Sequence, residues 1–166
     1  MYHQSHPFTP ATEGTDVLQR GDVVLFRFPL ADEDDEPGAP KRRPCLVLDT
    51  LTRGDERFVE IAYGTSADTR ANRGYEIVVK QPDARAAAGL SKPTRFVCAR
   101  RIIVHAGHGG FDGRTKGPHV IGRLDESLME RMNAVRARIQ AEADIAACYR
   151  EEQRREEQAR EDRGFR

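Results

Sequence analysis

No run of apolar residues in this 166-residue sequence is long enough to cross a membrane. Residues 1–19 also lack the charged start and apolar core of a secretion signal, and we expect them to form a flexible, polar leader. These two absences predict a cytoplasmic protein with no membrane contact. Because 38% of the residues are hydrophobic, the chain can still bury one core, and a single folded domain is expected.

Cysteines are few, and the spacing of the three does not match a zinc-binding motif. Cys45 and Cys98 lie inside apolar runs, which favours two small core residues over a disulfide. His105, His108 and His119 have neither a cysteine nor a suitably spaced carboxylate beside them, so we interpret them as ordinary loop histidines. No serine or cysteine stands in a nucleophile motif. The sequence therefore predicts no metal and no cofactor.

The chain also lacks a net charge, but its charges are unevenly distributed. Residues 1–40 carry a formal charge of −6 and residues 41–116 carry +7. Five consecutive acidic residues at 32–36 stand shortly before the basic run at 41–43. A basic body favours a phosphate backbone as partner. On charge alone, however, a solubilising surface with a solvated acidic loop is the simpler interpretation.

Short strand-like segments dominate the first two thirds of the chain. Some alternate apolar and polar residues, and the unbroken apolar run at 45–48 is typical of a strand that is buried on both faces. Their close spacing and the glycines and prolines between them predict a small antiparallel barrel of about five to seven strands in a mainly β (α+β) fold. The expected strands are residues 21–30, 45–50, 57–63, 75–80 and 96–104, with a short helical turn over 82–89 that glycine ends.

From Asp125 onward the apolar period becomes helical. Asp125 is a candidate N-cap, and Ser127 with Glu130 resembles a capping box one step later. One apolar face is then formed by residues 128, 132, 135 and 139, and we expect it to pack against the barrel. The barrel domain, with the start of this helix, is assigned to residues 20–140. Residues 141–166 form a charged tail, for which helix and disorder both remain open.

One possible site follows from strand geometry. If residues 45–50 and 57–63 form a hairpin centred on Gly54, Cys45 lies opposite Tyr63, and Arg43 lies opposite Thr65. A guanidinium offers two parallel hydrogen bonds to phosphate oxygens, and a hydroxyl can add one more. The same pair also fits an ordinary surface arginine beside a loop. Candidate substrate-binding neighbours are Lys41, Arg42, Ser66, Arg70 and Arg73.

Several motifs, taken in order, resemble the MazF/PemK family of toxins. In that family a Gly-Asp-led strand and a loop precede an Arg-Pro-led apolar strand, and the third strand ends in threonine or serine. A Gly-Leu-x-Lys-Pro-Ser segment and a closing element before a helix follow. The matching segments here are 20–24 (RGDVV), 42–48 (RRPCLVL), 63–66 (YGTS), 89–94 (GLSKPT) and 121–124 (IGRL). The resemblance covers residues 20–139.

This resemblance implies an SH3-like barrel, usually homodimeric, that cleaves single-stranded RNA without metal through attack of the ribose 2′-hydroxyl. It implies a catalytic role for Arg43 and a phosphate-holding role for Thr65, with Ser66 as a neighbour. It also implies a cognate antitoxin as a protein partner of this type II toxin–antitoxin component.

Two departures from the family pattern leave an alternative open. The first loop is longer and more acidic than usual, so no glutamate there, Glu36 included, receives a catalytic role. Residues 106–118 carry an unusual Gly/His-rich insertion. The alternative function is a non-catalytic SH3-like module that binds nucleic acid, DNA included, or protein, as gyrase-binding toxins do.

Overall fold

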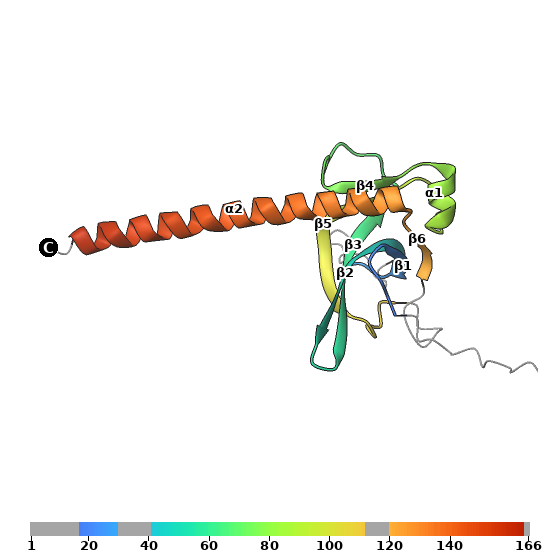
Figure 1. The fold of residues 1–166 in the computed structure, drawn as a ribbon, viewed down its shortest axis with the longest axis horizontal. Coiled ribbons are helices and arrows are strands. Elements are labelled where there is room, and N and C mark those ends of the chain that lie inside the picture. Colours follow the sequence, from blue (N-terminus) through green and yellow to red (C-terminus); the bar gives the residue numbers. More distant parts are fainter. Residues whose placement is uncertain (1–16, 30–40, 112–119, 165–166) are drawn as a thin grey trace, which may run out of the picture.

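The computed structural model describes residues 17–29, 41–111 and 120–164. In these ranges six antiparallel strands form one sheet with the order β4-β5-β3-β2-β1-β6, and two helices accompany it (Figure 1). The strands are β1 (Asp22–Phe26), β2 (Arg43–Arg53), β3 (Glu56–Thr65), β4 (Glu76–Val79), β5 (Thr94–His105) and β6 (Val120–Arg123), and the helices are α1 (Pro82–Ala87) and α2 (Glu126–Gly164).

The predicted α+β class, with a small antiparallel sheet and a C-terminal helix, is confirmed, but closure into a barrel is not. β4 and β6 are the two ends of the strand order and do not pair with each other. One isolated bridge, Phe26 with Phe111, brings the end of β1 against the segment that follows β5. The sheet is therefore open. A sequence indicates how many strands form, but it does not indicate whether the two edge strands meet, and for this reason closure was not predicted correctly.

All five expected strands are present, with different limits, and β6 adds a sixth. The first strand ends at Phe26, before the predicted limit, whereas β2 runs on through polar residues to Arg53. This extension forms because Gly54 adopts a positive φ of 62° and permits a two-residue turn, so that Arg53 pairs with Glu56. The expected helical turn is α1, and Gly89 (φ 67°) follows it.

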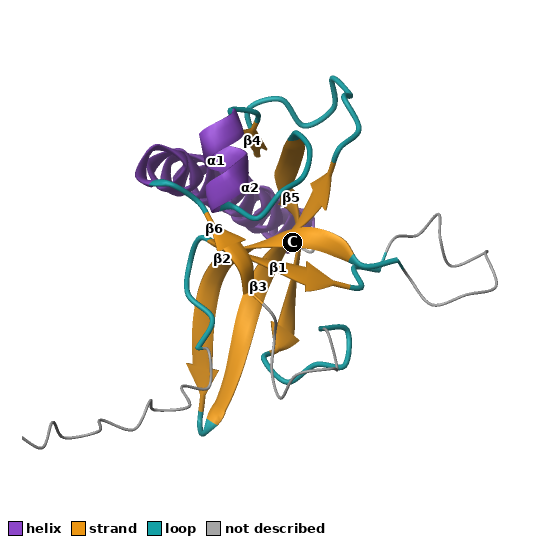
Figure 2. Ribbon diagram, turned by 90° about the vertical axis from the view of Figure 1, so that its right-hand side faces the viewer, coloured by secondary structure: helices purple, strands orange, loops and turns teal. Residues whose placement is uncertain are grey.

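Both faces of β2 are buried, as its unbroken apolar run predicts. Leu46 and Leu48 face the helices, while Cys45 and Val47 belong to the core on the other face of the sheet. Both helices lie on the same side of the sheet (Figure 2). The helix-side core also contains Val23, Ala62, Ile77, Val79, Ala84, Ala88, Leu90, Phe96, Cys98, Leu124, Met132 and Val135.

Helix α2 begins where the sequence predicts it. The backbone N–H of Leu128 donates a hydrogen bond of 2.9 Å to Oδ1 of Asp125, which satisfies one of the open N–H groups of the first turn. The capping box expected at Ser127 and Glu130 was wrong, because the helix already begins at Glu126. The predicted apolar face is confirmed, since Met132 and Val135 are buried and residues 128 and 139 pack against the same core.

The charged tail is helical as far as Gly164, and its side chains from residue 141 onward are exposed. Figure 1 shows this part of α2 projecting away from the sheet. Ion pairs one helical turn apart, such as Arg155 with Glu151 at 2.5 Å, support the exposed helix. Although α2 has 39 residues, it is too polar to cross a membrane, and no other helix in the described ranges could do so.

Four of the sequence interpretations fall wholly or largely outside the described residues. They are the leader up to residue 16, the acidic run at 32–36 with Glu36, residues 112–118 of the Gly/His-rich insertion, and His119.

Replacing Met132 by alanine should lower the free energy of unfolding by about 2–5 kcal/mol, because it opens a cavity between α2 and the sheet. Ile145, on the projecting half of the same helix, is 56% exposed, and its alanine variant should change stability by less than about 0.5 kcal/mol. Urea unfolding of both variants measures this difference. Equal losses of stability would mean that the projecting half has a packing partner in solution.

Candidate functional site

The register between β2 and β3 decides which side chains meet at the end of the sheet. Cys45 pairs with Tyr63, as predicted, and continuing this register places Thr65 opposite Arg43. At the tip of the hairpin the observed pairing is shifted by one residue from the predicted pairing, because the turn contains two residues instead of Gly54 alone. A bulge at Leu48, between Val47 and Asp49, corrects this difference. The strands therefore bring Arg43 and Thr65 to the same end.

Gly64 makes a close contact between β2, β3 and β5 at this end. A Cβ atom built on Gly64 would collide with the carbonyl oxygen of Pro44 and with the ring of Phe96. Only glycine fits between these two groups without moving the backbone of β2. The backbones of β2 and β3 thus approach each other closely beside the candidate site.

Arg43 is half-buried, and its guanidinium lies over an aromatic ring. Its Cζ is 5.8 Å from the ring centre of Tyr63, a distance typical of a cation–π contact. The ring of Tyr63 in turn packs against Phe28, with 5.5 Å between ring centres. Because an arginine side chain keeps its charge at all physiological pH values, this contact holds a permanent positive charge at the strand end.

The hydroxyl of Thr65 is held by its own backbone. Oγ1 accepts a 3.1 Å hydrogen bond from the backbone N–H of Ala67, two residues along the chain. A hydroxyl that accepts one hydrogen bond still has its own proton to donate. Thr65 is half-buried, so this hydroxyl lies at the surface, with its oxygen held by the N–H of Ala67.

Arg95, which the sequence analysis did not identify, fixes the loop that follows Thr65. It is buried on β5, pairs with Thr65 across the strands, and donates to Oε2 of Glu76 at 2.9 and 2.6 Å. It also donates to the carbonyl oxygens of residues 67, 69 and 71, at 3.0, 2.6 and 3.1 Å. A buried charge is tolerated only with such compensation. The available signal was a lone arginine within the apolar strand 94–98.

The predicted substrate-binding residues lie on two segments beside Arg43 and Thr65, and all of them are exposed. Lys41 and Arg42 directly precede β2. Ser66, Arg70 and Arg73 lie on the loop that Arg95 holds. In the described part of the chain no hydrogen bond joins either of these loop arginines to Thr65, so they surround the strand end without being fixed to it.

A second arginine reaches the ring of Tyr63 from β5, and the sequence analysis missed it as well. On β5 the partner of Ala62 is Arg101, but the partner of Tyr63 is already Val97. The three residues between them, 98–100, have no partner on β3, so this part of the strand bulges out. The guanidinium of Arg100 lies over the ring of Tyr63, with its Cζ 5.4 Å from the ring centre.

Cys45 lies close to this site but is unsuited to act as a nucleophile. Burial raises the pKa of its thiol to about 12, and burial likewise raises the pKa of Cys98 to about 12. A thiol must lose its proton to attack an electrophile or to bind a metal. Cys45 is therefore a core residue, and the candidate site is defined by the guanidinium of Arg43 and the hydroxyl of Thr65.

The two described histidines take part in loop packing. Nδ1 of His105 accepts a hydrogen bond from the N–H of Gly107, and its ring packs against Phe58. Nδ1 of His108 accepts from Gly110 in the same way. Within residues 17–29, 41–111 and 120–164, no group of three or more histidine, cysteine or acidic side chains is arranged to hold a metal ion.

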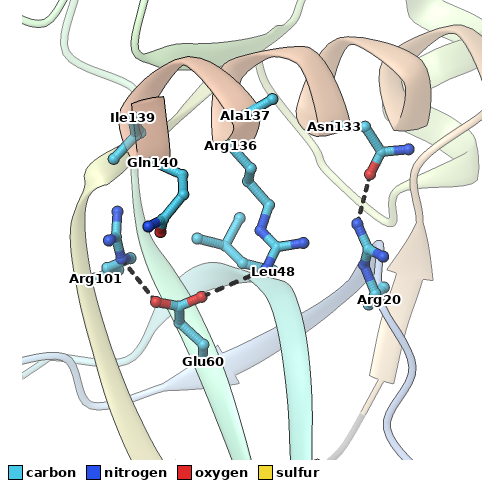
Figure 3. Close-up of a pocket in the computed structure, with 9 residues that line it drawn as sticks. All are labelled: Arg20, Leu48, Glu60, Arg101, Asn133, Arg136, Ala137, Ile139 and Gln140. Carbon is cyan, nitrogen blue, oxygen red and sulfur yellow. Dashed lines mark hydrogen bonds and ion pairs between the residues drawn. The ribbon is translucent and has the colours of Figure 1, made fainter. Parts of the chain in front are cut away.

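A separate pocket of about 450 Å³ lies between α2 and the sheet (Figure 3). Glu60 pairs there with Arg101 at 2.7 Å and with Arg136 at 3.8 Å, and Arg136 also pairs with Asp49 at 2.5 Å. Arg20 donates to the amide oxygen of Asn133 on α2. Because these groups pair with one another, we interpret the pocket as a polar attachment of α2 to the sheet. Leu48, Ala137, Ile139 and Gln140 complete its lining.

A thiol reagent at pH 8 should modify one cysteine of the native protein rapidly and all three after unfolding. Cys148 is exposed, whereas Cys45 and Cys98 are buried and remain protonated until the pH approaches their raised pKa values. The Cys148→Ser variant should therefore show no rapid reaction. Rapid modification of a second thiol would contradict the packing of β2 or β5.

Replacing Arg95 by methionine should lower the free energy of unfolding by about 3–5 kcal/mol, since Glu76 would lose its partner in a buried position. Hydrogen exchange of the backbone amides of residues 66–75 should also become faster, because three carbonyl groups of this loop lose their donor. Arg73→Met, on the same loop but exposed, is the matched control and should change neither quantity. Unchanged exchange in the Arg95 variant would refute the anchoring role.

Comparison with models of known protein families gives no match for this chain, and comparison with curated protein sequences gives none either.

Proposed function

We propose that this chain is an endoribonuclease of the MazF/PemK type that cleaves single-stranded RNA without a metal ion. The observation that carries the proposal is that Arg43, with its charge over Tyr63, shares one strand end with the oriented hydroxyl of Thr65. Exposed basic side chains on both flanking segments suit a phosphate backbone as substrate.

In this reaction the 2′-oxygen of a ribose forms a bond to the neighbouring phosphorus, and the bond from phosphorus to the next 5′-oxygen breaks. The products are a 2′,3′-cyclic phosphate and a free 5′-hydroxyl, so the proton that the 2′-hydroxyl loses is balanced by the proton that the 5′-oxygen gains. Arg43 would stabilise the negative charge that develops on the phosphorane oxygens. Thr65 would donate a hydrogen bond to one of these oxygens. A guanidinium carries its full complement of protons and cannot readily accept another, so we assign Arg43 charge stabilisation rather than proton abstraction.

Three features of the fold and sequence support a toxin of this type. The order of the motifs between residues 20 and 139 resembles that family. The six-stranded antiparallel sheet followed by a C-terminal helix is compatible with such a toxin, and an isolated bridge joins Phe26 to Phe111 after β5. The exposed arginines beside Arg43 would suit an antitoxin that lays an acidic or extended segment across the RNA site. We further propose, from the resemblance, that the active form is a homodimer.

A second candidate function, a binding module without catalysis, is favoured by α2. Its projecting half exposes Ile145 (56%) and Tyr149 (64%), and neither residue belongs to the candidate site at the strand end. Such a module would use the same basic strand end to bind nucleic acid or a protein. The two candidates differ in whether a covalent bond of the RNA is broken.

In EDTA, the purified chain should cut a long single-stranded RNA at a limited set of sites and leave cyclic phosphate ends. Arg43→Ala should reduce the cleavage rate by about 100- to 1,000-fold, because a positive charge at the developing phosphorane is lost. Thr65→Val keeps the shape of the side chain but removes the donor, and a loss of about tenfold or more is expected. Mapping the cut ends and timing the cleavage measure these effects.

Arg57→Ala is the matched control, because Arg57 is exposed at the other end of β3, about 26 Å from Thr65 at the rise of a β-strand. Its rate should equal that of the wild type. Cutting that persists in the Arg43 variant would mean a different active site or a contaminating nuclease. If the folded wild type cuts none of several RNAs, the binding module replaces the nuclease as the proposed function.

A further inference from the structure

We propose that Arg100 is a second phosphate-binding residue, which holds the phosphate next to the one that is cleaved. This role rests on the RNA-cleaving function proposed above. Arg100 and Arg43 lie beside the same aromatic ring. Their Cζ atoms lie 5.4 and 5.8 Å from the same ring centre, that of Tyr63, so the two charges can be no farther apart than these two distances combined. One nucleotide of backbone separates neighbouring phosphates of a strand, so two neighbouring phosphates can lie within that limit.

The bulge on β5 explains why Arg100 reaches this ring although it belongs to another strand. In a regular antiparallel pair, side chains alternate between the two faces, and each residue has a partner. Residues 98–100 have no partner on β3, so the chain gains room to turn a side chain toward Tyr63. Bulges commonly redirect a side chain beside a functional site.

The neighbouring Arg101 shows what a purely structural arginine looks like on the same strand. Arg101 forms an ion pair of 2.7 Å with Glu60 and lines the pocket under α2. Arg100, in contrast, forms no ion pair with a carboxylate of residues 17–29, 41–111 or 120–164, and its side chain is exposed. Of these two adjacent arginines, Arg101 is therefore paired with a carboxylate, whereas Arg100, at the candidate site, is available to an anion.

The ring of Tyr63 provides a common support for both cations. Tyr63 is only 8% exposed and packs against Phe28, so its position is fixed by the core. A cation over an aromatic face is held in place while its outward N–H groups remain able to donate. Arg100 is thus supported beside Arg43, a placement that suits a flexible single strand whose phosphates must be aligned for in-line attack.

The test is the salt dependence of RNA binding by the full chain. The probe is a fully 2′-O-methylated copy of the RNA used for cleavage, which lacks the attacking hydroxyl and cannot be cut by this mechanism. For Arg100→Ala, the slope of log affinity against log salt concentration should be shallower than the wild-type slope by about 0.7, the value for one phosphate contact on a single strand. Affinity at about 0.1 M salt should fall by about tenfold.

Two further variants distinguish a phosphate contact from a general effect of charge or folding. Arg100→Lys keeps the charge and should keep most of the slope, while its affinity lies between those of the wild type and Arg100→Ala. Arg57→Ala removes one positive charge at the remote end of the sheet and should behave like the wild type. Circular dichroism confirms that each variant is folded.

The outcomes separate this inference from the proposed nuclease function. A wild-type slope and affinity in Arg100→Ala, or an equal loss in Arg57→Ala, would overturn the role of Arg100 even if the wild type cleaves unmodified RNA. Failure of the wild type to bind the probe would overturn it as well. Reduced slope in Arg100→Ala together with no cleavage by the wild type would support Arg100 as a phosphate-binding residue and refute the nuclease.

Discussion

The pairing of β2 with β3 is the constraint on which the rest of the structure depends. β2 lies inside the sheet, between β1 and β3, and its side chains contribute alternately to the two cores. A shift of one residue in this pairing would exchange the faces of every side chain beyond it, so the buried positions allow a single register. That register brings Arg43 beside Thr65, and the candidate site is therefore a consequence of how the core packs. Stability and the position of the site cannot be separated on this strand.

Two irregularities in otherwise regular strands adapt the sheet to this site. The bulge at Leu48 shifts the register of the hairpin by one residue between its tip and its base. The longer bulge at residues 98–100 allows Arg100 to reach Tyr63. On β3, Gly64 lets the backbone approach Pro44 of β2 so closely that a side chain would not fit. Ideal strands would pack the same core, but they would not bring these charged groups together.

The sequence predicted the number and order of most elements, because apolar periodicity reports which face of a segment is buried. It also predicted the pairing of Cys45 with Tyr63, although by a count centred on Gly54 alone. The prediction was correct because the bulge at Leu48 offsets the second turn residue, and neither feature has a clear sequence signal. Arg95 and Arg100 were missed for a related reason. An arginine is normally an exposed residue, so the three-dimensional contacts were needed to show that Arg95 is buried and that Arg100 lies on a bulge of β5. The open form of the sheet was not predictable either, since closure into a barrel depends on whether two edge strands that are far apart in the sequence meet.

The absence of a net charge is compatible with a phosphate-binding site once the ion pairs are considered. Several carboxylates are used to neutralise arginines that hold the fold together: Glu76 for Arg95, Glu60 for Arg101, Asp49 for Arg136 and Asp22 for Arg123. On the projecting half of α2, acidic and basic side chains also pair along the helix. The balance of the whole chain therefore reflects its structural pairs. Beside the strand end, Arg100 forms no ion pair with a carboxylate of the described residues, and Arg70 and Arg73 lie exposed on the neighbouring loop. A site for an anion needs an excess of positive charge only within about 10 Å, since salt screens more distant charges at physiological ionic strength.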